Sequence, residues 1–432
     1  MNGAAARSYD DLVRDCVHCG FCLPACPTYA SWGDEMDSPR GRIDLMKGVA
    51  DGSLALDASV VRHFDACLGC MACVPACPSG VRYDLLIERT RARVERDYAR
   101  TPGDRAFRAM IFSLFPYPQR LRALSYALYA YARTGLQRLV RGSGVLALLP
   151  RRLRQLDALL PSITARDLSE RLPARVAATG KRRGSVALVA GCVQRTFFPN
   201  VNAATLRVLS AEGFEASVPA GQGCCGALSL HAGRDDEAKA FARKLIAAFE
   251  REPADAIVVN AAGCGSTLKE YGGLLAGDAQ WRDRAAAFAA RVRDVSEFLA
   301  GVEPVAPRTP LRLRVAYHDA CHLANAQGIR EQPRALLRSI PGLELVEVPR
   351  GNECCGSAGI YNLVEPASAT EIGERKVDNV LSVRPELLAS ANPGCTLQIA
   401  SLLHERGTAL EAAHPIELLD RSIAGRDSRA SA

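Results

Sequence analysis

The chain has 432 residues, of which 48% are hydrophobic and 23% charged, and its formal net charge is +7. This length exceeds a single hydrophobic core and predicts about three domains, and the composition excludes a disordered or fibrous protein. No apolar run is long enough to span a membrane, and the N-terminal residues lack the apolar segment of a secretory signal. Sixteen cysteines in such a chain indicate reduced thiolates and metal binding, so we expect the protein in the cytoplasm.

Two runs of four cysteines dominate the first 100 residues. Both runs have the spacing C-x2-C-x2-C-x3-C-P, which binds cubane iron–sulfur clusters. In two-cluster proteins of this kind the fourth cysteine of each run ligates the other cluster, so we predict two [4Fe–4S] clusters with crossed ligation. The predicted ligands are Cys16, Cys19, Cys22 and Cys77 for cluster 1, and Cys67, Cys70, Cys73 and Cys26 for cluster 2.

Zinc and disulfides are the alternatives for these eight cysteines. Zinc prefers two Cys-x-x-Cys pairs set well apart, which tandem runs of four match less well. Gly20 and Gly69 suit the tight turn inside each run, because glycine adopts positive φ without strain. Between the runs Ser38 predicts a helix start before an apolar stripe, and a further helix is predicted over 83–98. Residues 1–100 are therefore expected to form a helical, ferredoxin-type domain.

Residues 101–183 form a predicted connector of unusual charge. Positions 105–154 hold ten arginines, no aspartate or glutamate, and seven interleaved Phe and Tyr residues. Leucines at helical spacing predict amphipathic helices in this segment. Such a stretch can dock on an acidic partner subunit, lie on an anionic membrane surface, or bury its aromatic rings beneath a solvated arginine face. Nucleic acid is not an expected partner, because no nucleic-acid-binding motif accompanies the charge.

Beyond residue 183 the sequence becomes α/β and repeats itself, with predicted repeats over 184–305 and 306–424. Each repeat has a cysteine after its first strand, then a Cys-Cys-Gly turn, then a Gly-Cys pair, and corresponding cysteines are 129 to 131 residues apart. Alternating strands and helices predict a parallel sheet in each repeat, with the cysteines on loops at strand ends. These cysteines are Cys192, Cys224, Cys225 and Cys264 in repeat 1, and Cys321, Cys354, Cys355 and Cys395 in repeat 2.

Four cysteines in each repeat are enough to ligate a metal or a further cluster if the loops converge. We favour metal binding or redox chemistry over inert thiols, because two adjacent thiols at a glycine-flanked turn are unusual for packing alone. His231, His318 and His322 lie close in sequence to these cysteines. The position of His322 is compatible with a metal ligand, a proton donor or a helix cap.

With these motifs the chain resembles the glycolate oxidase iron–sulfur subunit family, within a wider group that shares cysteine-rich domains with heterodisulfide reductase. The similarity runs from about residue 15 to residue 419. Stretches that match especially well include Cys16-Val17-His18-Cys19-Gly20-Phe21-Cys22, Ser38-Pro39-Arg40-Gly41-Arg42-Ile43 and Asn260-Ala261-Ala262-Gly263-Cys264-Gly265. The resemblance implies a multidomain α and α/β fold, in which a helical two-cluster ferredoxin-type domain precedes a tandem repeat of α/β cysteine-rich domains.

The same resemblance implies an electron-transfer subunit that is not catalytic on substrate by itself. A flavoprotein partner would oxidise glycolate to glyoxylate, and the clusters would pass its electrons toward a quinone or another acceptor. A peripheral position at the cytoplasmic face of the membrane would fit this role. The chain has no flavin or nicotinamide fingerprint of its own, which agrees with substrate oxidation on a partner, and no catalytic residue is predicted.

Each repeat departs from the heterodisulfide reductase pattern, which ends in Cys-x-x-Cys. Here Cys264 is followed by Gly-Ser-Thr and Cys395 by Thr-Leu-Gln, so the fifth cysteine is missing. The noncubane cluster and disulfide-reducing chemistry of the full pattern are therefore not carried over. Two alternatives stay open. The chain could transfer electrons for another flavoprotein, one that acts on lactate, 2-hydroxyglutarate or glycerol 3-phosphate. It could also be a heterodisulfide-reductase-like catalytic subunit.

Overall fold

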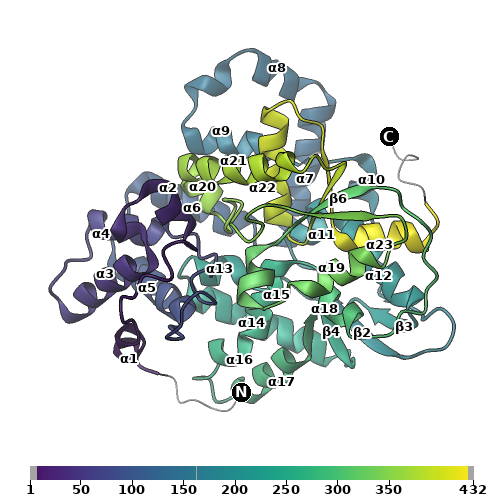
Figure 1. Cartoon of the computed structure of the whole chain (residues 1–432), viewed down its shortest axis with the longest axis horizontal. Helices are drawn as coiled ribbons and strands as arrows, with labels where there is room; N and C mark the ends of the chain where they lie inside the picture. The colour runs from purple at the N-terminus through teal and green to yellow at the C-terminus, as the bar shows by residue number, and fades with distance from the viewer. Residues whose placement is uncertain (1–6, 162, 427–432) are drawn as a thin grey trace.

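The computed structural model describes residues 7–161 and 163–426 of the chain. A helical N-terminal part, a helical linker and two α/β units pack against one another (Figure 1). The two sheets are built mainly from parallel strands, and the helical part precedes both of them in the chain. The fold class predicted from the sequence is thereby confirmed.

Short helices surround the two cysteine runs. Ser38 accepts a hydrogen bond from the Gly41 backbone N–H and so caps the helix whose start the sequence predicts. The apolar stripes of the helices meet around Phe64 and Leu86. The elements of this part are α1 (Tyr9–Arg14), α2 (Pro27–Trp32), η1 (Glu35–Asp37), α3 (Pro39–Asp51), α4 (Ala58–Ala66) and α5 (Tyr83–Asp97).

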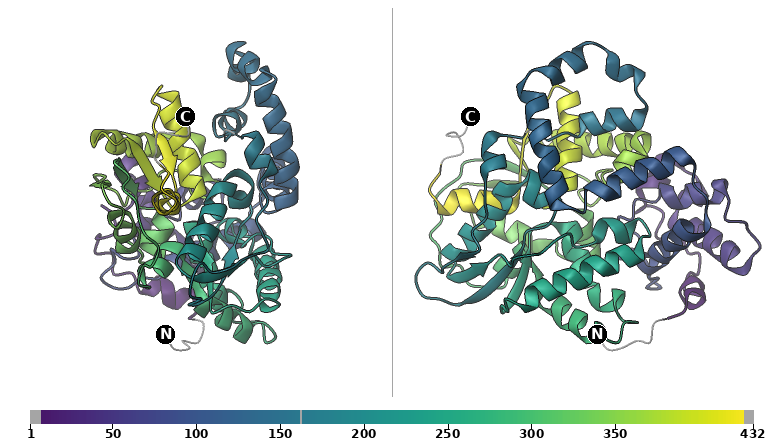
Figure 2. Two further views of the ribbon diagram at one scale, coloured as in Figure 1. Left: turned by 90° about the vertical axis from the view of Figure 1, so that its right-hand side faces the viewer. Right: turned by 180° about the vertical axis from the view of Figure 1, so that it is seen from behind.

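The linker is a set of amphipathic helices that runs behind the α/β units. Its elements are α6 (Pro102–Leu114), α7 (Pro118–Arg133), α8 (Leu136–Gly142), η2 (Val145–Leu148), α9 (Arg151–Ala158) and α10 (Ala165–Ser169). In Figure 1 α8 forms the upper edge of the molecule, and the side view in Figure 2 shows this region projecting from the rest.

Repeat 1 is an open sheet with the strand order β1-β3-β2-β4-β5, in which only β1 is antiparallel to its neighbour. Its strands are β1 (Arg175–Val176), β2 (Gly184–Val189), β3 (Phe214–Ser217), β4 (Ala256–Val259) and β5 (Val292–Asp294). Its helices are α11 (Val193–Phe197), α12 (Pro199–Ala211), α13 (Ala227–His231), α14 (Asp235–Glu250), α15 (Ala262–Lys269), α16 (Tyr271–Leu274), α17 (Arg282–Arg291) and α18 (Val295–Ala300). Because β1 precedes residue 184, the sheet begins before the predicted start of the repeat.

Repeat 2 is a fully parallel sheet with the strand order β7-β6-β8-β9. Its strands are β6 (Arg314–His318), β7 (Glu344–Glu347), β8 (Leu387–Ser390) and β9 (Glu411–Ala413). Its helices are the π-helical turn η3 (His322–Ala326), α19 (Glu331–Arg338), α20 (Tyr361–Val364), α21 (Pro366–Ser382), α22 (Pro393–Glu405) and α23 (Pro415–Ile423).

The two repeats pack against each other through corresponding helices. Helix α12 of repeat 1 contacts α23 of repeat 2, and α19, the counterpart of α12, contacts α18, the counterpart of α23. A single apolar core joins both sheets, and Arg207 of α12 forms an ion pair with Asp420 of α23 at 2.8 Å. This reciprocal packing has the form of a two-fold interface between copies of one unit, as a duplicated sequence predicts.

Candidate functional site

The first site is a small surface cavity lined by four cysteines from both runs: Cys16, Cys19, Cys22 and Cys77. Gly20 has φ of +86°, and a Cβ atom there would lie 2.9 Å from Arg40 Nη1, so the turn needs glycine as predicted. Cys19 is exposed, and the neighbouring apolar side chains of Val17 and Phe21 are each 67% exposed. A cluster held here would lie at the protein surface beside an apolar rim.

The second site is a small internal cavity lined by Cys26, Cys67, Cys70 and Cys73, all of which are buried. Each of the two cavities thus contains three cysteines of one run and the last cysteine of the other. The fold brings together the two predicted sets of four. That these residues bind iron stays a prediction.

Buried polar groups shape the second cavity. Arg42 is only 1% exposed, and its guanidinium donates to Asp37 Oδ1 at 3.1 Å and to the His63 carbonyl at 2.7 Å. Burial alone would raise the pKa of Cys67, but the nearby cations of Arg42 and Arg91 lower this pKa overall. Positive charge therefore favours the thiolate form that ligates a metal.

The cysteines of the two repeats all lie beyond the carboxyl ends of parallel strands. In repeat 1 they follow β2, β3 and β4, and in repeat 2 they follow β6, β7 and β8. In each sheet the first of these strands lies between the other two, so the cysteines gather where the strand order reverses. Open α/β sheets bind their ligands at such a switch point.

Within each repeat the thiols form a contiguous chain. Cys192 Sγ lies 3.6 Å from Cys224 Sγ. The Cys225 thiol is within hydrogen-bonding reach of the thiols of Cys224 and Cys264. The same succession of contacts links Cys321, Cys354, Cys355 and Cys395 in repeat 2. The loops therefore converge, which was the condition for metal binding in the repeats.

Both thiol chains line one cavity of about 510 Å³ at the centre of the molecule, which we call the central cavity. Leucines of the linker, among them Leu121, Leu124 and Leu156, also line this cavity, as do Leu68 and Gly69 of the second cysteine run. The central cavity therefore adjoins the second cluster site directly.

Repeat 2 holds the loop of the second cysteine run in place. His322 Nε2 lies 3.0 Å from the Gly69 carbonyl, and Asn325 donates to the Cys70 carbonyl at 3.1 Å. Burial, with help from His231, lowers the pKa of His322 to about 3, so the ring is neutral. Since its Nδ1 lies 2.9 Å from Ser266 Oγ, both nitrogens are occupied. His322 thus acts as a bridge to the loop and has no free nitrogen for a metal.

His231 and Glu88 form a neutral pair at the edge of the central cavity. His231 Nδ1 lies 3.0 Å from Glu88 Oε1, and the His231 ring packs edge-on against His322. Burial raises the pKa of Glu88 to about 8, with a further contribution from Asp84, and burial lowers the pKa of His231 to about 4. Both shifts favour the uncharged forms of the two side chains.

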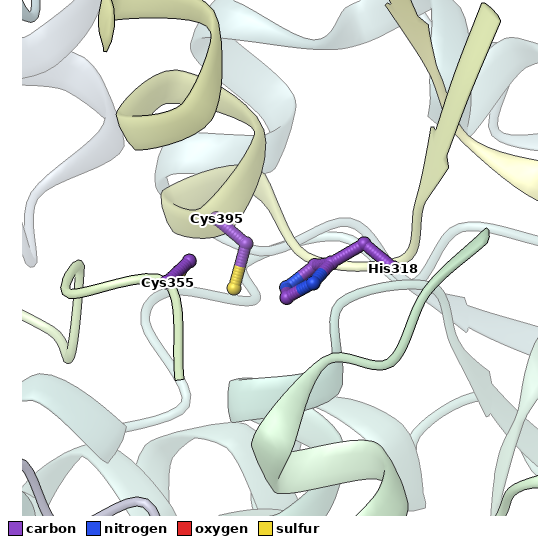
Figure 3. Close-up of side chains that lie close together, drawn as sticks. All are labelled: His318, Cys355 and Cys395. Atoms are coloured by element: carbon purple, nitrogen blue, oxygen red, sulfur yellow. The ribbon is translucent and has the colours of Figure 1, made fainter. Parts of the chain in front are cut away.

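His318 is the third histidine, and it lies at the end of β6 beside Cys355 and Cys395 (Figure 3). Neither of its ring nitrogens has a hydrogen-bond partner among the described residues. The fold thus gives different surroundings to the three histidines that the sequence singled out.

The linker has two different faces. Its inner leucines line the central cavity, whereas Leu139 and Leu148 at its projecting end are 67% and 84% exposed. Further exposed apolar residues of this end are Leu136, Val145, Leu149 and Leu153. These exposed side chains are leucines and a valine, so the alternative in which the aromatic rings of the linker are buried beneath a solvated arginine face stays a prediction. No helix in residues 7–161 or 163–426 is long and apolar enough to cross a membrane.

Three family profiles match the chain. The profile described as "4Fe-4S dicluster domain" covers residues 12–81, and "Cysteine-rich domain" covers 186–269 and 315–400. The profile "Glycolate oxidase iron-sulfur subunit, linker region" covers 103–160. Together they include all sixteen cysteines and most of the linker.

Full-length relatives agree with the profiles. The chain is 41% identical over 428 residues to the "Probable glycolate oxidase iron-sulfur subunit" of Bacillus subtilis, with 97% of this chain and 96% of the relative covered. It is 36% identical over 431 residues to the "Glycolate oxidase iron-sulfur subunit" of Escherichia coli, with the same coverage. The chain belongs to the glycolate oxidase iron–sulfur subunit family.

Membership of this family shows that the chain is an iron–sulfur protein related to subunits of glycolate oxidase. "Lactate utilization protein A" of Exiguobacterium is 31% identical over 240 residues, which are 55% of this chain and 98% of the relative. A crystal structure of a hypothetical protein from Helicobacter pylori superposes with a TM-score of 0.55 at 6% identity, covering 96% of this chain and 76% of that one. This likeness concerns the fold alone.

Sequence reasoning missed Arg42 and Glu88 as parts of the site. Arg42 occupies the apolar stripe of α3 with Leu45, Met46 and Val49. A charged residue at a core-facing position indicates a buried partner, and this signal was available. Glu88 gave no comparable signal, because its neighbour His231 lies 143 residues away.

Proposed function

We propose that the chain is the iron–sulfur electron-transfer subunit of a glycolate oxidase complex. A flavoprotein partner oxidises glycolate to glyoxylate, and this chain carries the electrons away toward a quinone or another acceptor. The observation that supports this most is the pair of cavities, each lined by three cysteines of one run and the last of the other. In this proposal each holds one [4Fe–4S] cluster with the crossed ligands named above.

The arrangement of the sites supports a direction of electron flow. Cluster 1 lies at the surface, where the exposed Val17 and Phe21 offer an apolar rim to a partner. Burial raises the pKa of Cys73, and thiols of both runs, including Cys22, raise it further, which supports a short path between the two sites. Cys321 acts in the same way on Cys70. Electrons would enter at cluster 1, pass to cluster 2 and reach the cysteines of the central cavity, where a further metal or redox thiols receive them.

The predicted division of the chain fits these roles. Residues 1–100 would hold the two clusters, residues 101–183 would act as a docking linker, and residues 184–305 and 306–424 would form the two cysteine-rich units. The complex would lie in the cytoplasm, peripheral to the membrane. The second candidate function is electron transfer for a different flavoprotein, along the same route through the clusters. It is favoured by the relatives named lactate utilization protein A, which match about half of this chain.

Anaerobic mixing of the cluster-loaded chain with glycolate tests the function. Glycolate alone should neither bleach the cluster absorbance nor reduce a dye acceptor, because in this proposal the flavin belongs to the partner. A catalytic amount of a separately purified glycolate-oxidising flavoprotein should then bleach the clusters. Glycolate turnover by the chain alone would overturn the proposal, and faster bleaching with a lactate-oxidising flavoprotein would favour the second candidate.

The projecting end of the linker should bind an anionic membrane surface. Exposed leucines beside Arg138 and Arg141 suit the boundary between lipid tails and acidic headgroups. In a flotation assay at low salt, the chain should float with anionic vesicles, and the double variant Leu139→Asp with Leu148→Asp should stay in the aqueous fraction. Val305→Asp changes an equally apolar exposed site in repeat 1 and should not alter flotation. A wild-type chain that stays in the aqueous fraction would leave docking on an acidic partner as the role of this surface.

A further inference from the structure

His231 and Tyr361 occupy corresponding positions in the two repeats and line the same cavity. The offset of 130 residues that relates Cys225 to Cys355 also relates these two residues. His231 ends α13 and Tyr361 begins α20, and both border the central cavity. The duplication therefore brings one polar side chain from each repeat to this cavity.

Each of these two side chains has a buried polar atom without a partner. Neither His231 Nε2 nor Tyr361 Oη has a hydrogen-bond partner among the described residues. Because Glu88 is protonated below its pKa of about 8, it donates to His231 Nδ1, and Nε2 then carries the ring hydrogen. Buried polar atoms are nearly always paired, so two unpaired donors at one cavity indicate a ligand with two acceptor atoms.

Other residues that line the central cavity favour an apolar ligand. Leu121, Leu124 and Leu128 follow one another along α7 and border it. The cavity volume of about 510 Å³ lies within the range of about 300–1,000 Å³ that is typical of small-molecule sites. Such sites usually combine apolar walls with a few polar groups that orient the ligand. The central cavity therefore suits a flat, apolar molecule that accepts two hydrogen bonds.

The place of the cavity in the electron path adds a redox requirement. Leu68 and Gly69 of the second cysteine run line it, so in the proposed function the electrons of cluster 2 arrive here. A quinone has the required properties, because its apolar ring carries two opposite carbonyl oxygens and accepts two electrons. Its reduction to the hydroquinone also consumes two protons, and at least one of them must reach the interior.

Buried acidic side chains form a proton path to His231. Glu88 Oε1 lies 3.0 Å from His231 Nδ1. Burial raises the pKa of Glu270 to about 8, as it does for Glu88, and the charge of Glu88 contributes to that shift. Asp84 contributes to both shifts, and its partly exposed side chain connects the two glutamates to solvent. Acids with a pKa near the working pH are effective proton donors.

We propose that the central cavity binds a quinone between His231 and Tyr361 and that Glu88 delivers a proton to it. The inference rests on the proposed function, in which the clusters supply two electrons one at a time. One proton passes from Glu88 through the His231 ring to the nearer carbonyl oxygen, and Glu270 restores the proton on Glu88. The other oxygen accepts a hydrogen bond from the Tyr361 hydroxyl and takes its proton from water as the hydroquinone leaves.

Equilibrium dialysis of the oxidised, cluster-loaded chain with ubiquinone-1, a short-tailed quinone, tests binding. The wild type should bind about one molecule per chain, since a single cavity holds the ligand. Tyr361→Phe should bind about three- to tenfold more weakly, the usual effect of one lost hydrogen bond. Tyr126→Phe removes a hydroxyl group from a half-exposed linker residue and should bind like the wild type. Equal binding by the wild type and Tyr361→Phe would overturn the proposal.

Reoxidation of photochemically reduced clusters tests proton delivery. Ubiquinone-1 takes up protons with its electrons, whereas ferricyanide takes up electrons alone. Glu88→Gln can still hydrogen-bond to His231 but cannot pass a proton. Reoxidation by saturating ubiquinone-1 should therefore slow at least about tenfold, and reoxidation by ferricyanide should not change. Asp97→Asn removes an exposed acid from the same helix, α5, and should leave both rates unchanged. A quinone rate that Glu88→Gln does not alter would overturn the proton path.

The pH dependence of these rates separates proton delivery from a structural effect. The wild-type rate with ubiquinone-1 should fall as the pH rises through about 8, because Glu88 is protonated below this pKa and loses its proton above it. The ferricyanide rate should not show this fall. The charged and titratable groups that face Glu88 are Arg82, Asp84, Arg91, His231, Asp235 and Glu270. Since the clusters are reduced without glycolate or a flavoprotein, failure of this inference is distinguishable from failure of the proposed function.

Discussion

Cys26→Ala is expected to remove the buried cluster 2 and to leave the surface cluster 1 intact, although Cys26 belongs to the first cysteine run. Iron should fall from about eight to about four atoms per chain, since each [4Fe–4S] cluster holds four. Cys77→Ala should give the same iron content but remove cluster 1 instead. The two variants are thus a matched pair that differ in which cluster survives.

The rate at which a chelator removes iron identifies the cluster that remains in each variant. The site of cluster 1 includes the exposed Cys19, whereas all four cysteines around cluster 2 are buried. An iron chelator in the presence of a mild oxidant should therefore strip the cluster of Cys26→Ala at least about tenfold faster than that of Cys77→Ala. Both variants should also lose the magnetic interaction between two reduced clusters in low-temperature EPR spectra.

The order of the two chelation rates distinguishes crossed ligation from the arrangement in which each run binds its own cluster. If each run bound its own cluster, Cys26→Ala would keep the buried cluster and Cys77→Ala the exposed one. The order of the chelation rates would then be reversed. A chain that loses all of its iron in both variants would show that the two clusters assemble together, which contradicts two independently held sites.

Arg42→Met is expected to destabilise the N-terminal part by about 3–5 kcal/mol, the usual effect of removing one partner from a buried ion pair. The Arg42 and Asp37 side chains are 1% and 2% exposed and lie 3.1 Å apart. The variant leaves Asp37 with His63 alone, and it also removes the donor to Thr28 Oγ1. Urea unfolding of the anaerobic protein, followed by far-ultraviolet circular dichroism, measures this loss.

The same change should alter electron transfer. Arg42 places a positive charge beside Cys67, where it favours negative charge on the thiolate. A reduced cluster carries one more negative charge than an oxidised one, so removing Arg42 should lower the reduction potential of cluster 2 by tens of millivolts. An EPR-monitored redox titration should show this shift for cluster 2 and little change for cluster 1.

Arg62→Met is the matched control for Arg42→Met. Arg62 forms a loose ion pair with Asp34 at 3.9 Å, with side chains 64% and 44% exposed. Exposed pairs contribute about 0–1 kcal/mol, so this variant should unfold almost like the wild type. Similar losses in both arginine variants would contradict a special role for the buried Arg42 pair.

Local features of the fold were accessible from local sequence. Helix α5 ends one residue before its predicted end, and Ser38 caps α3 at the helix start that the sequence predicted. Apolar periodicity and capping residues act within a few positions along the chain, so they report on such elements directly. The near-constant offset between the two sets of cysteines likewise revealed the duplication, because copied units keep the spacing of their loops.

Which cysteines share a site was predictable only in part. The two crossed sets were predicted from the spacing of the cysteine runs, and the fold brings each set around one cavity. For the eight other cysteines, the sequence did not predict whether their loops converge. That convergence depends on two sheets packing through α12 with α23 and α18 with α19, and this packing brings Ala262 N to 3.1 Å from the Ala391 carbonyl. No short-range pattern encodes a contact between segments so far apart.

Sequence alone predicted the family, the fold class, the duplicated cysteine loops and the two crossed cysteine sets, because spacing and periodicity along the chain carry these signals. Only the tertiary structure decided that the cavity of the first predicted set lies at the surface, that Arg42 is buried beside Cys67, and that the nitrogens of His318 have no partner among the described residues where repeat 1 has Val189. Burial and unpaired polar atoms are properties of packed surroundings, to which segments hundreds of residues apart contribute. They therefore become visible only when the whole chain is folded.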